Sequence, residues 1–133
     1  MKCIVKAILI NPNKLMLMVL RDNKPTIPHP NYWSLLGGRL EDGEDALTGL
    51  KRELKEEISC PTYDFKLVGE SIQYGCKKII YRGKFDEKLE NIELYEGQKL
   101  CLFDLKDFKK LRIPLSEKRY LLKNIDKILD ETK

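Results

Sequence analysis

The 133-residue sequence has little of what several protein classes require. It has four cysteines without a C-x-x-C pair, and its single histidine, His29, is distant from all of them in sequence. A zinc site is therefore not expected, and the cysteines fit reduced thiols that serve as small apolar residues. No apolar run approaches the ~20 residues that a membrane-spanning helix needs.

The N-terminus also lacks the features of a secretion signal. Its apolar run is interrupted by Lys6 and ends at Asn11-Pro12-Asn13 without a small-residue cleavage site. A first β-strand is the better interpretation, and we expect one cytoplasmic domain over residues 1–133. The net charge of +4 favours the approach of a polyanionic substrate, but it is too small to indicate a dedicated nucleic-acid-binding protein.

The spacing of apolar and turn-forming residues predicts alternating strands and helices. Strands are expected at 2–10, 14–21, 32–36, 65–74, 77–85 and 98–104, and helices at 46–58, 104–111 and 115–129. Three prolines make 22–31 a loop. The strand over 32–36 is expected to end at Gly37-Gly38. Asp45 is the expected N-cap of the first helix. This order predicts a mixed α/β/α layering.

The segment Arg52-Glu53-Leu54-Lys55-Glu56-Glu57 carries the most informative pattern. At about 100° per residue, its three glutamates fall within an arc of roughly 100°, where their charges repel. A hard divalent cation such as Mg²⁺ offsets this repulsion because it prefers oxygen ligands. Such a metal can neutralise a diphosphate while a further carboxylate orients a water. For the helix alone, the alternative is an ordinary charged surface helix with paired lysines and arginine.

The surrounding spacing strengthens the metal interpretation. From Gly38 there are five residues to Glu44 and seven more to the segment that begins at Arg52. This pattern resembles the Nudix box, G-x5-E-x7-R-E-U-x-E-E-x-G-U with U a bulky apolar residue, and every position through Glu57 matches. Residues 38–60 depart from it only at the end, where Ser59 replaces Gly and Cys60 the final apolar residue. Upstream, Leu36 replaces the family's usual Pro.

The chain is similar to the MutT-like branch of the Nudix hydrolases in length and element order. The resemblance implies an α/β fold, the Nudix α/β/α sandwich with a mixed β-sheet, in which the box forms a catalytic loop-helix-loop. It also implies Mg²⁺, for which Mn²⁺ can substitute, and hydrolysis of a nucleoside diphosphate linked to another group.

The resemblance also implies roles for individual residues. The metal contacts it implies are Gly37 through its carbonyl, Glu53, Glu56, Glu57 and, downstream, Glu96, for which Glu90 and Glu93 are rivals. The residues it assigns to catalysis are Glu53 and Glu56, together with Arg52 and Glu44 as the pair that fixes the catalytic carboxylate. Which glutamate acts as the general base stays open.

Three positions are expected to contact substrate: Arg21, Gly38 and Ser116. Arg21 matches a position that contacts phosphates in MutT-like enzymes, and its alternative is a surface arginine paired with Asp22 or solvent. Ser116 stands near the position of an asparagine that reads the purine in relatives specific for oxidised guanine. Its alternative, which we favour, is a plain helix N-cap. Tyr74 is expected to pack on its hairpin, with base stacking as the alternative.

The expected substrate is a (deoxy)nucleoside triphosphate, cleaved to monophosphate and pyrophosphate, with clean-up of oxidised nucleotides as one setting. ADP-ribose or a nucleotide sugar and the 5′ end of RNA are alternatives, although RNA favours a longer basic track with interleaved aromatics. A non-catalytic Nudix-fold binding module is the alternative from another class. The box retains all its carboxylates, which favours an enzyme. Both a monomer and a homodimer fit the sequence, and no membrane partner is expected.

Overall fold

The computed structural model describes residues 2–59 and 64–129, so the expectation for Cys60 lies outside the described residues. The strands are β1 (Lys2–Ile10), β2 (Leu15–Leu20), β3 (Trp33–Ser34), β4 (Leu36–Arg39), β5 (Lys66–Gln73), β6 (Cys76–Lys84) and β7 (Lys99–Asp104). The helices are α1 (Ala46–Glu57), α2 (Leu115–Lys123) and α3 (Ile125–Leu129), with 3₁₀ turns at Leu89–Asn91 and Leu105–Lys110. None of the described helices is long and apolar enough to cross a membrane.

The described strands form one seven-stranded mixed sheet. Its main order is β3-β2-β1-β6-β5, while β4 pairs with β1 and β7 pairs with β2. β1 and β6 run parallel and the other pairs are antiparallel. The long parallel contact, from Lys2 opposite Cys76 to Ile10 opposite Lys84, makes β1 the central strand.

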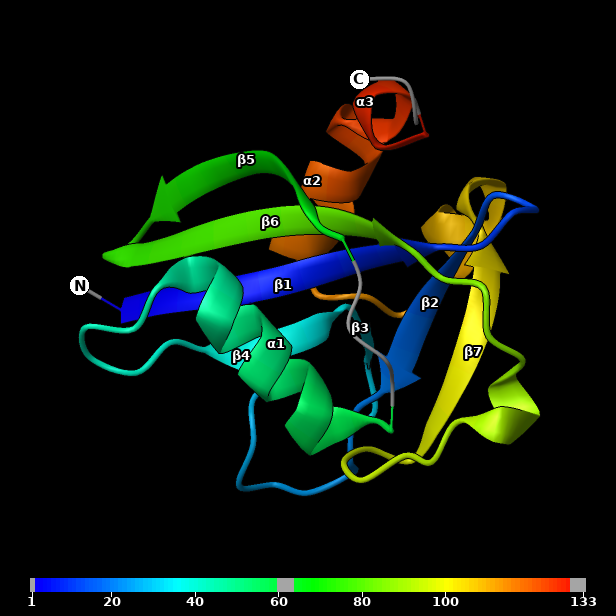
Figure 1. The fold of residues 1–133 in the computed structure, drawn as a ribbon, viewed down its shortest axis with the longest axis horizontal. Coiled ribbons are helices and arrows are strands. Elements are labelled where there is room, and N and C mark those ends of the chain that lie inside the picture. Colours follow the sequence, from blue (N-terminus) through cyan, green and yellow to red (C-terminus); the bar gives the residue numbers. More distant parts are fainter. Residues whose placement is uncertain (1, 60–63, 130–133) are drawn as a thin grey trace.

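Helices cover both faces of the sheet, because the strands alternate apolar side chains between two cores. Val5, Ala7 and Leu9 of β1 belong to the core under α1. Ile8 and Ile10 belong to the core under α2 and α3 on the other face. Figure 1 shows α1 in front of the strands and α2 behind β5 and β6. The expected α/β/α sandwich with a mixed sheet is therefore confirmed.

α1 agrees with its prediction to within one residue. Asp45 caps it, accepting a hydrogen bond from the Thr48 backbone N–H at 3.2 Å. Leu50 and Leu54 bury the apolar stripe against the sheet. The helix ends in extended backbone at Ile58 (φ −142°, ψ 154°).

The prediction that Gly37-Gly38 ends a strand is wrong, because both glycines lie inside β4. They pair with Lys6 and Val5 of β1. Gly37 has φ +132°, and a Cβ there would lie 2.1 Å from the Val5 carbonyl oxygen. The glycine permits close approach of two strands, which a turn-former rule cannot distinguish from a strand end.

The prediction of one terminal helix over 115–129 is also wrong. The helix is interrupted at Asn124, where the backbone departs from helical angles (φ −109°, ψ 18°) and the side-chain Nδ2 donates to the Tyr120 carbonyl. Asn competes with helical hydrogen bonding in this way. The N-cap position of α2 is Pro114, so the favoured interpretation of Ser116 as the N-cap is wrong as well. Ser116 instead accepts a hydrogen bond from Lys78 Nζ at 3.1 Å.

Candidate active site

The carboxylates of α1 pack directly against the glycine pair of β4. Glu57 is only 7% exposed, and its Oε1 accepts a hydrogen bond from the Gly37 N–H at 2.7 Å. A Cβ on Gly38 would lie 2.4 Å from Oε2 of Glu53. The missing side chain of Gly38 therefore leaves the space in which the Glu53 carboxylate lies, whereas the backbone N–H of Gly37 holds Glu57.

Arg52 connects the turn before α1 to the carboxylates on the helix. Its Nε and one terminal nitrogen each donate to Glu44 at 2.8 Å, a bidentate ion pair. The other terminal nitrogen donates to Glu53 at 3.1 Å. The hydrogen bond from Arg52 holds the pKa of Glu44 down at about 2, and Glu44 raises the pKa of Arg52. This arrangement suits the implied role of Arg52 and Glu44 in fixing a carboxylate.

Glu56 does not join Glu53 and Glu57. Its carboxylate accepts from Arg52 at 3.2 Å, and its side chain is half exposed. The three glutamates share a helix face, as the spacing predicts, but the structure brings only Glu53 and Glu57 against β4.

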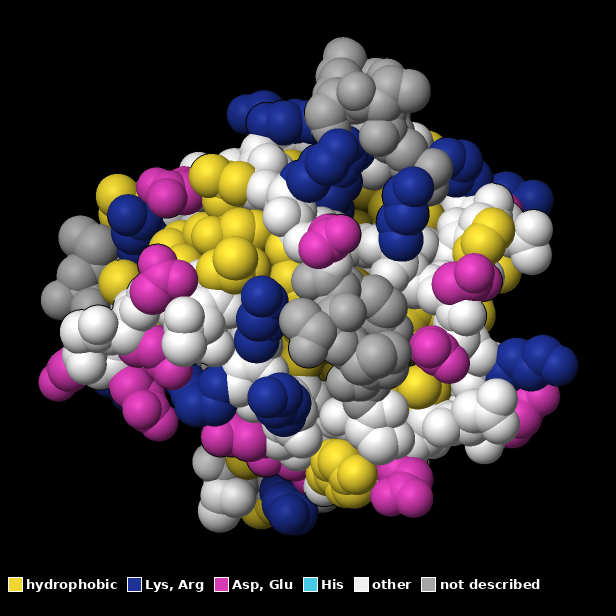
Figure 2. Space-filling view, in the orientation of Figure 1, with side chains coloured by type: hydrophobic (Ala, Val, Ile, Leu, Met, Phe, Trp, Pro, Cys, Tyr) yellow, Lys and Arg dark blue, Asp and Glu magenta, His cyan; other side chains and the backbone are white. Residues whose placement is uncertain are grey.

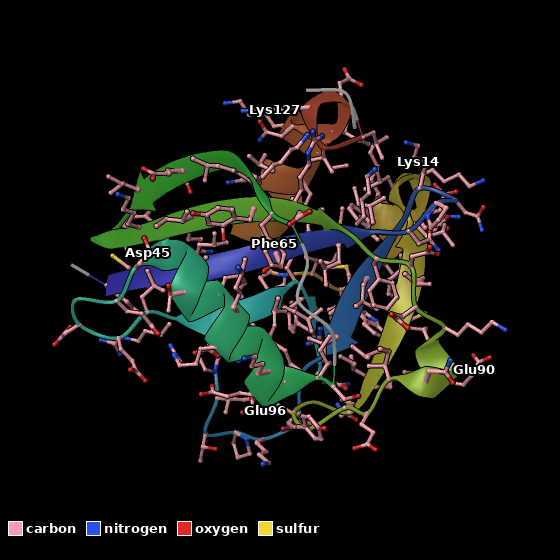
Figure 3. The ribbon with its side chains drawn as sticks, in the orientation of Figure 1. Lys14, Asp45, Phe65, Glu90, Glu96 and Lys127 are labelled. Carbon is pink, nitrogen blue, oxygen red and sulfur yellow. The ribbon has the colours of Figure 1, made fainter. Side chains whose placement is uncertain are left out.

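Glu96 is brought to this site by the end of α1. The Tyr95 N–H donates to the Glu57 carbonyl at 2.7 Å, and Ser59 exchanges hydrogen bonds with the backbone of Glu93. Glu96 consequently lines one cavity together with Glu57. Figure 3 shows Glu96 beside the end of α1, whereas Glu90 lies away from it on the 3₁₀ turn.

The electrostatics of this carboxylate group suit a bound cation. Burial raises the pKa of Glu57 to about 8, opposed by Lys6 and the Gly37 N–H and reinforced by Glu53 and Glu96. Burial, together with the nearby Glu56 and Glu96 charges, also raises the pKa of Glu53, although Arg52 opposes this. Within residues 2–59 and 64–129, no three metal-ligating side chains already form a cluster. The donors are nevertheless hard carboxylate oxygens whose mutual repulsion a divalent cation relieves.

Two cavities lie near this site, but only one of them is lined by its carboxylates. This cavity, of about 470 Å³, is lined by the basic residues Arg21 and Lys24 and by the acids Asp22, Glu57 and Glu96. The alternative for Arg21, an ion pair with Asp22, is not observed among the described residues, and Arg21 Nε donates instead to the Pro28 carbonyl at 2.9 Å.

The other cavity, of about 790 Å³, lies between α2 and the sheet. Ser116 lines it, so the structure separates Ser116 from Arg21. Sequence reasoning did not single out Lys6 or Glu117 in this region. Lys6 Nζ donates to the Leu35 carbonyl at 3.1 Å, and the Glu117 carboxylate accepts from the Leu35 N–H and the Ser34 hydroxyl. The sequence signal that could have identified Lys6 is its charge within an otherwise apolar strand.

Comparisons with known proteins agree with this geometry. A family model described as NUDIX domain matches residues 4–123. A search of curated proteins gives no match. Solved structures share the fold, among them a MutT protein from work on Aliivibrio salmonicida and Vibrio cholerae. It is 20% identical with a TM-score of 0.79, and the match covers 95% of this chain and 98% of that one.

Two further structures are similar. A MutT protein from Methanosarcina mazei is 19% identical over 98% of this chain and 96% of that chain, with a TM-score of 0.74. The NUDIX domain of Shewanella oneidensis NrtR, solved with ADP ribose, is 14% identical over 94% and 86%, with a TM-score of 0.73. At these identities the structural likeness establishes the fold alone.

Proposed function

The chain belongs to the Nudix family of hydrolases, and we propose that it cleaves a nucleoside triphosphate to the monophosphate and pyrophosphate. The observation that carries the proposal is the packing of Glu53 and Glu57 against Gly37-Gly38, beside a cavity that holds Arg21 and Lys24. The buried Glu57 beside Arg21 and Lys24 suits a diphosphate, whose charge a cation at the carboxylates and these two basic side chains would share. We also propose that residues 1–133 form one domain and that the protein is cytoplasmic.

Nudix hydrolases generally use divalent metal ions, and we propose Mg²⁺ here. Its ligands would be Glu53, Glu57 and Glu96 with the Gly37 carbonyl, while Glu56 would first have to leave Arg52. A cation bound there neutralises the diphosphate and lowers the pKa of water.

The side chains of this site have separate roles in the reaction. Glu53 orients the attacking water and accepts its proton, a role suited to a carboxyl whose pKa burial raises. Arg52 holds Glu53 in place through the hydrogen bond described above. Arg21 and Lys24 line the cavity beside Glu57 and bind the departing pyrophosphate. The water oxygen bonds to phosphorus, and pyrophosphate leaves with the electrons of the broken anhydride bond.

A substrate panel tests this proposal. Ordinary and oxidised nucleoside triphosphates, a nucleotide sugar, ADP-ribose and capped RNA are incubated with Mg²⁺, and the products are identified. ADP-ribose is included because the NrtR domain was solved with it. We expect pyrophosphate and a monophosphate from a triphosphate. Turnover of ADP-ribose alone would reassign the substrate, and no turnover at all would indicate a binding module.

A variant pair ties the activity to the site. Glu57→Gln keeps an acceptor for the Gly37 N–H but removes the charge, so turnover should fall by orders of magnitude. Glu90→Gln on the 3₁₀ turn, away from the site, is the matched control and should retain full activity. Equal activity of the two variants would exclude Glu57 from the chemistry.

A further inference from the structure

The larger cavity contains lysines where the sheet would ordinarily place apolar residues. On β1 and β6, Ile8 and Ile80 bury their side chains in the core beneath α2. Two residues earlier on the same face of each strand stand Lys6 and Lys78, both partly buried. Lys6 donates to the Leu35 carbonyl and Lys78 to the Ser116 hydroxyl, so both have only uncharged hydrogen-bond partners. Lysine is rarely buried unless its charge is paired, so charged residues that continue an apolar core favour a functional explanation.

The cavity has more positive than negative side chains. Lys6 and Lys78 approach it from the sheet, and Arg119 and Lys123 approach it from α2. None of these four forms an ion pair with another residue of the described ranges 2–59 and 64–129. The acid in the lining, Glu117, is already engaged by the Leu35 N–H and the Ser34 hydroxyl. The cavity therefore presents four cations against a single carboxylate.

Apolar and aromatic surfaces complete the cavity. Leu35 and Ile80 are buried in its lining, and Tyr120 is half-buried. At its rim Tyr74 is 96% exposed, which contradicts the expectation that it packs on its hairpin, and Leu115 is 59% exposed. Rings and aliphatic groups suit the faces of a base, whereas the lysines suit phosphate oxygens. This combination fits a nucleotide better than a bare anion or a neutral nucleoside.

The cavity also adjoins the candidate metal site. Lys6 is the register partner of Gly37, and its charge opposes the rise in the pKa of Glu57. Leu35 lines the cavity two residues before Gly37. A substrate whose diphosphate lies at Glu53 and Glu57 can thus extend its nucleoside into this space.

We propose that the substrate carries a further phosphate on its ribose, at the 3′ position, and that Lys78, Arg119 and Lys123 bind it. This inference rests on the proposed function and narrows its substrate class. A 3′ phosphate ester has two sources, a free 3′-phosphorylated nucleotide and the first internucleotide phosphate at the 5′ end of RNA. Both sources present the same 3′ phosphate ester to the protein, and the kinetic experiment below is designed to distinguish them.

Binding of product-like ligands tests the site without metal or turnover. Calorimetry compares a nucleoside 3′,5′-bisphosphate with the matching 5′-monophosphate in the presence of a chelator. We expect the bisphosphate to bind at least about tenfold more tightly, the effect of one charge-assisted contact. Lys78→Gln and Lys123→Gln should each reduce that ratio several-fold. Lys123 is exposed, so its variant tests the proposal without endangering the fold.

Lys77→Gln is the matched control. Lys77 precedes Lys78 on β6, so its side chain points to the opposite face of the sheet, where it pairs with Glu70 at 3.3 Å. The variant removes the same charge from the protein and should leave the ratio unchanged. A ratio near one in the wild type, or equal losses from Lys77→Gln and Lys78→Gln, would overturn the proposal.

Kinetics then distinguish the sources and separate this inference from the proposed function. Each nucleoside 5′-triphosphate is compared with its 3′-phosphorylated form and with a short 5′-triphosphate RNA. A preference for the phosphorylated mononucleotide or for the RNA supports the inference and identifies the source. Turnover of plain triphosphates without preference overturns it and leaves the proposed function intact. No turnover of any triphosphate, with bisphosphate binding retained, contradicts the proposed function alone.

Discussion

Two glycines beside α1 determine where its carboxylates lie, and they do so in different ways. Gly37 has a backbone conformation that favours glycine, with φ +132°. Gly38 has no positive φ, so a larger residue there is opposed by the Glu53 carboxylate rather than by its own backbone. A carboxylate is the movable end of a flexible side chain, so it can yield without unfolding the protein.

We therefore predict that Gly38→Ala lowers kcat/KM by about 10²-fold with little change in the free energy of unfolding. The added methyl displaces Glu53 by the order of an ångström, and displacements of that size can produce such losses. Steady-state kinetics and urea unfolding measure the two effects. Unchanged kinetics would mean that the position of Glu53 does not matter to turnover.

Gly43→Ala is the complementary control. Gly43 has φ +76°, and a Cβ added there would meet no neighbouring atom within 4 Å. Alanine there should reduce stability by about 1 kcal/mol through backbone strain while kinetics stay normal. The two variants together separate loss of geometry from loss of stability.

Glu57 makes the stability of the metal-free protein depend on pH. Its pKa is about 8 in the folded chain, mainly because of burial, and about 4.3 when unfolded. The folded state therefore binds the proton more tightly. The contribution of this group to stability is complete below about pH 4.3 and is lost as the pH rises through 8.

We predict that Glu57→Gln, which resembles the protonated acid, removes this dependence. With a chelator present, the variant should equal the wild type near pH 4 and exceed it in free energy of unfolding at pH 9. Urea unfolding at both pH values measures the difference. Added Mg²⁺ should then stabilise the wild type but not the variant. Parallel pH profiles in the chelator would contradict the assignment of the buried charge to Glu57.

The way α1 ends explains why the chain departs from the family pattern at Ser59. The family glycine suits a left-handed helix end, but here Ile58 is extended and Ser59 has no positive φ. The Ser59 hydroxyl accepts from the Glu93 N–H, and its own N–H donates to the Glu93 carbonyl. These contacts hold the segment that leads to Glu96.

We predict that restoring the family residue is harmful. Ser59→Gly loses a hydrogen bond and gains backbone freedom, which together should reduce stability by about 1–2 kcal/mol. Mg²⁺ binding should weaken several-fold, because Glu96 is held less firmly. Ser59→Ala, which loses only the hydroxyl, should show a smaller effect in thermal unfolding and Mg²⁺ titration. A more stable glycine variant would contradict this explanation.

Elements governed by local rules were predictable, and those governed by distant contacts were not. α1 follows from its apolar spacing and from Asp45, and both features are local. The Gly37-Gly38 strand was missed because its role depends on β1, which lies far earlier in the chain. Asn124 interrupts the last helix through a side-chain contact that the periodicity of its leucines hides.

In the candidate site, too, local features were predictable from the sequence and distant contacts were not. Spacing placed Glu53, Glu56 and Glu57 on one face, but it could not show that Glu56 turns to Arg52. Glu96 was accessible through its place before a strand, and the structure adds the contacts that bring it to Glu57. The cationic cavity required the sheet register, because Lys6, Lys78 and Lys123 come from three separate elements.

At the scale of the whole molecule, charge is distributed unevenly relative to the modest net value of +4. The face seen in Figure 2 mixes acidic and basic side chains around α1 and carries an apolar patch over β5 and β6. The cavity under α2, by contrast, gathers lysines and an arginine. Attraction of a polyanion should therefore depend on that cavity more than on the overall charge.

Salt dependence measures this attraction. We predict that kcat/KM for a nucleotide falls several-fold between about 20 and 300 mM KCl, because the screening length shortens to less than the dimensions of the cavity. Lys78→Gln and Lys77→Gln lower the net charge equally, yet they lie on opposite faces of β6. Lys78→Gln should flatten the salt dependence, whereas Lys77→Gln should reproduce the wild-type slope. Equal flattening by both variants would show that net charge, rather than the arrangement of cations under α2, attracts the substrate.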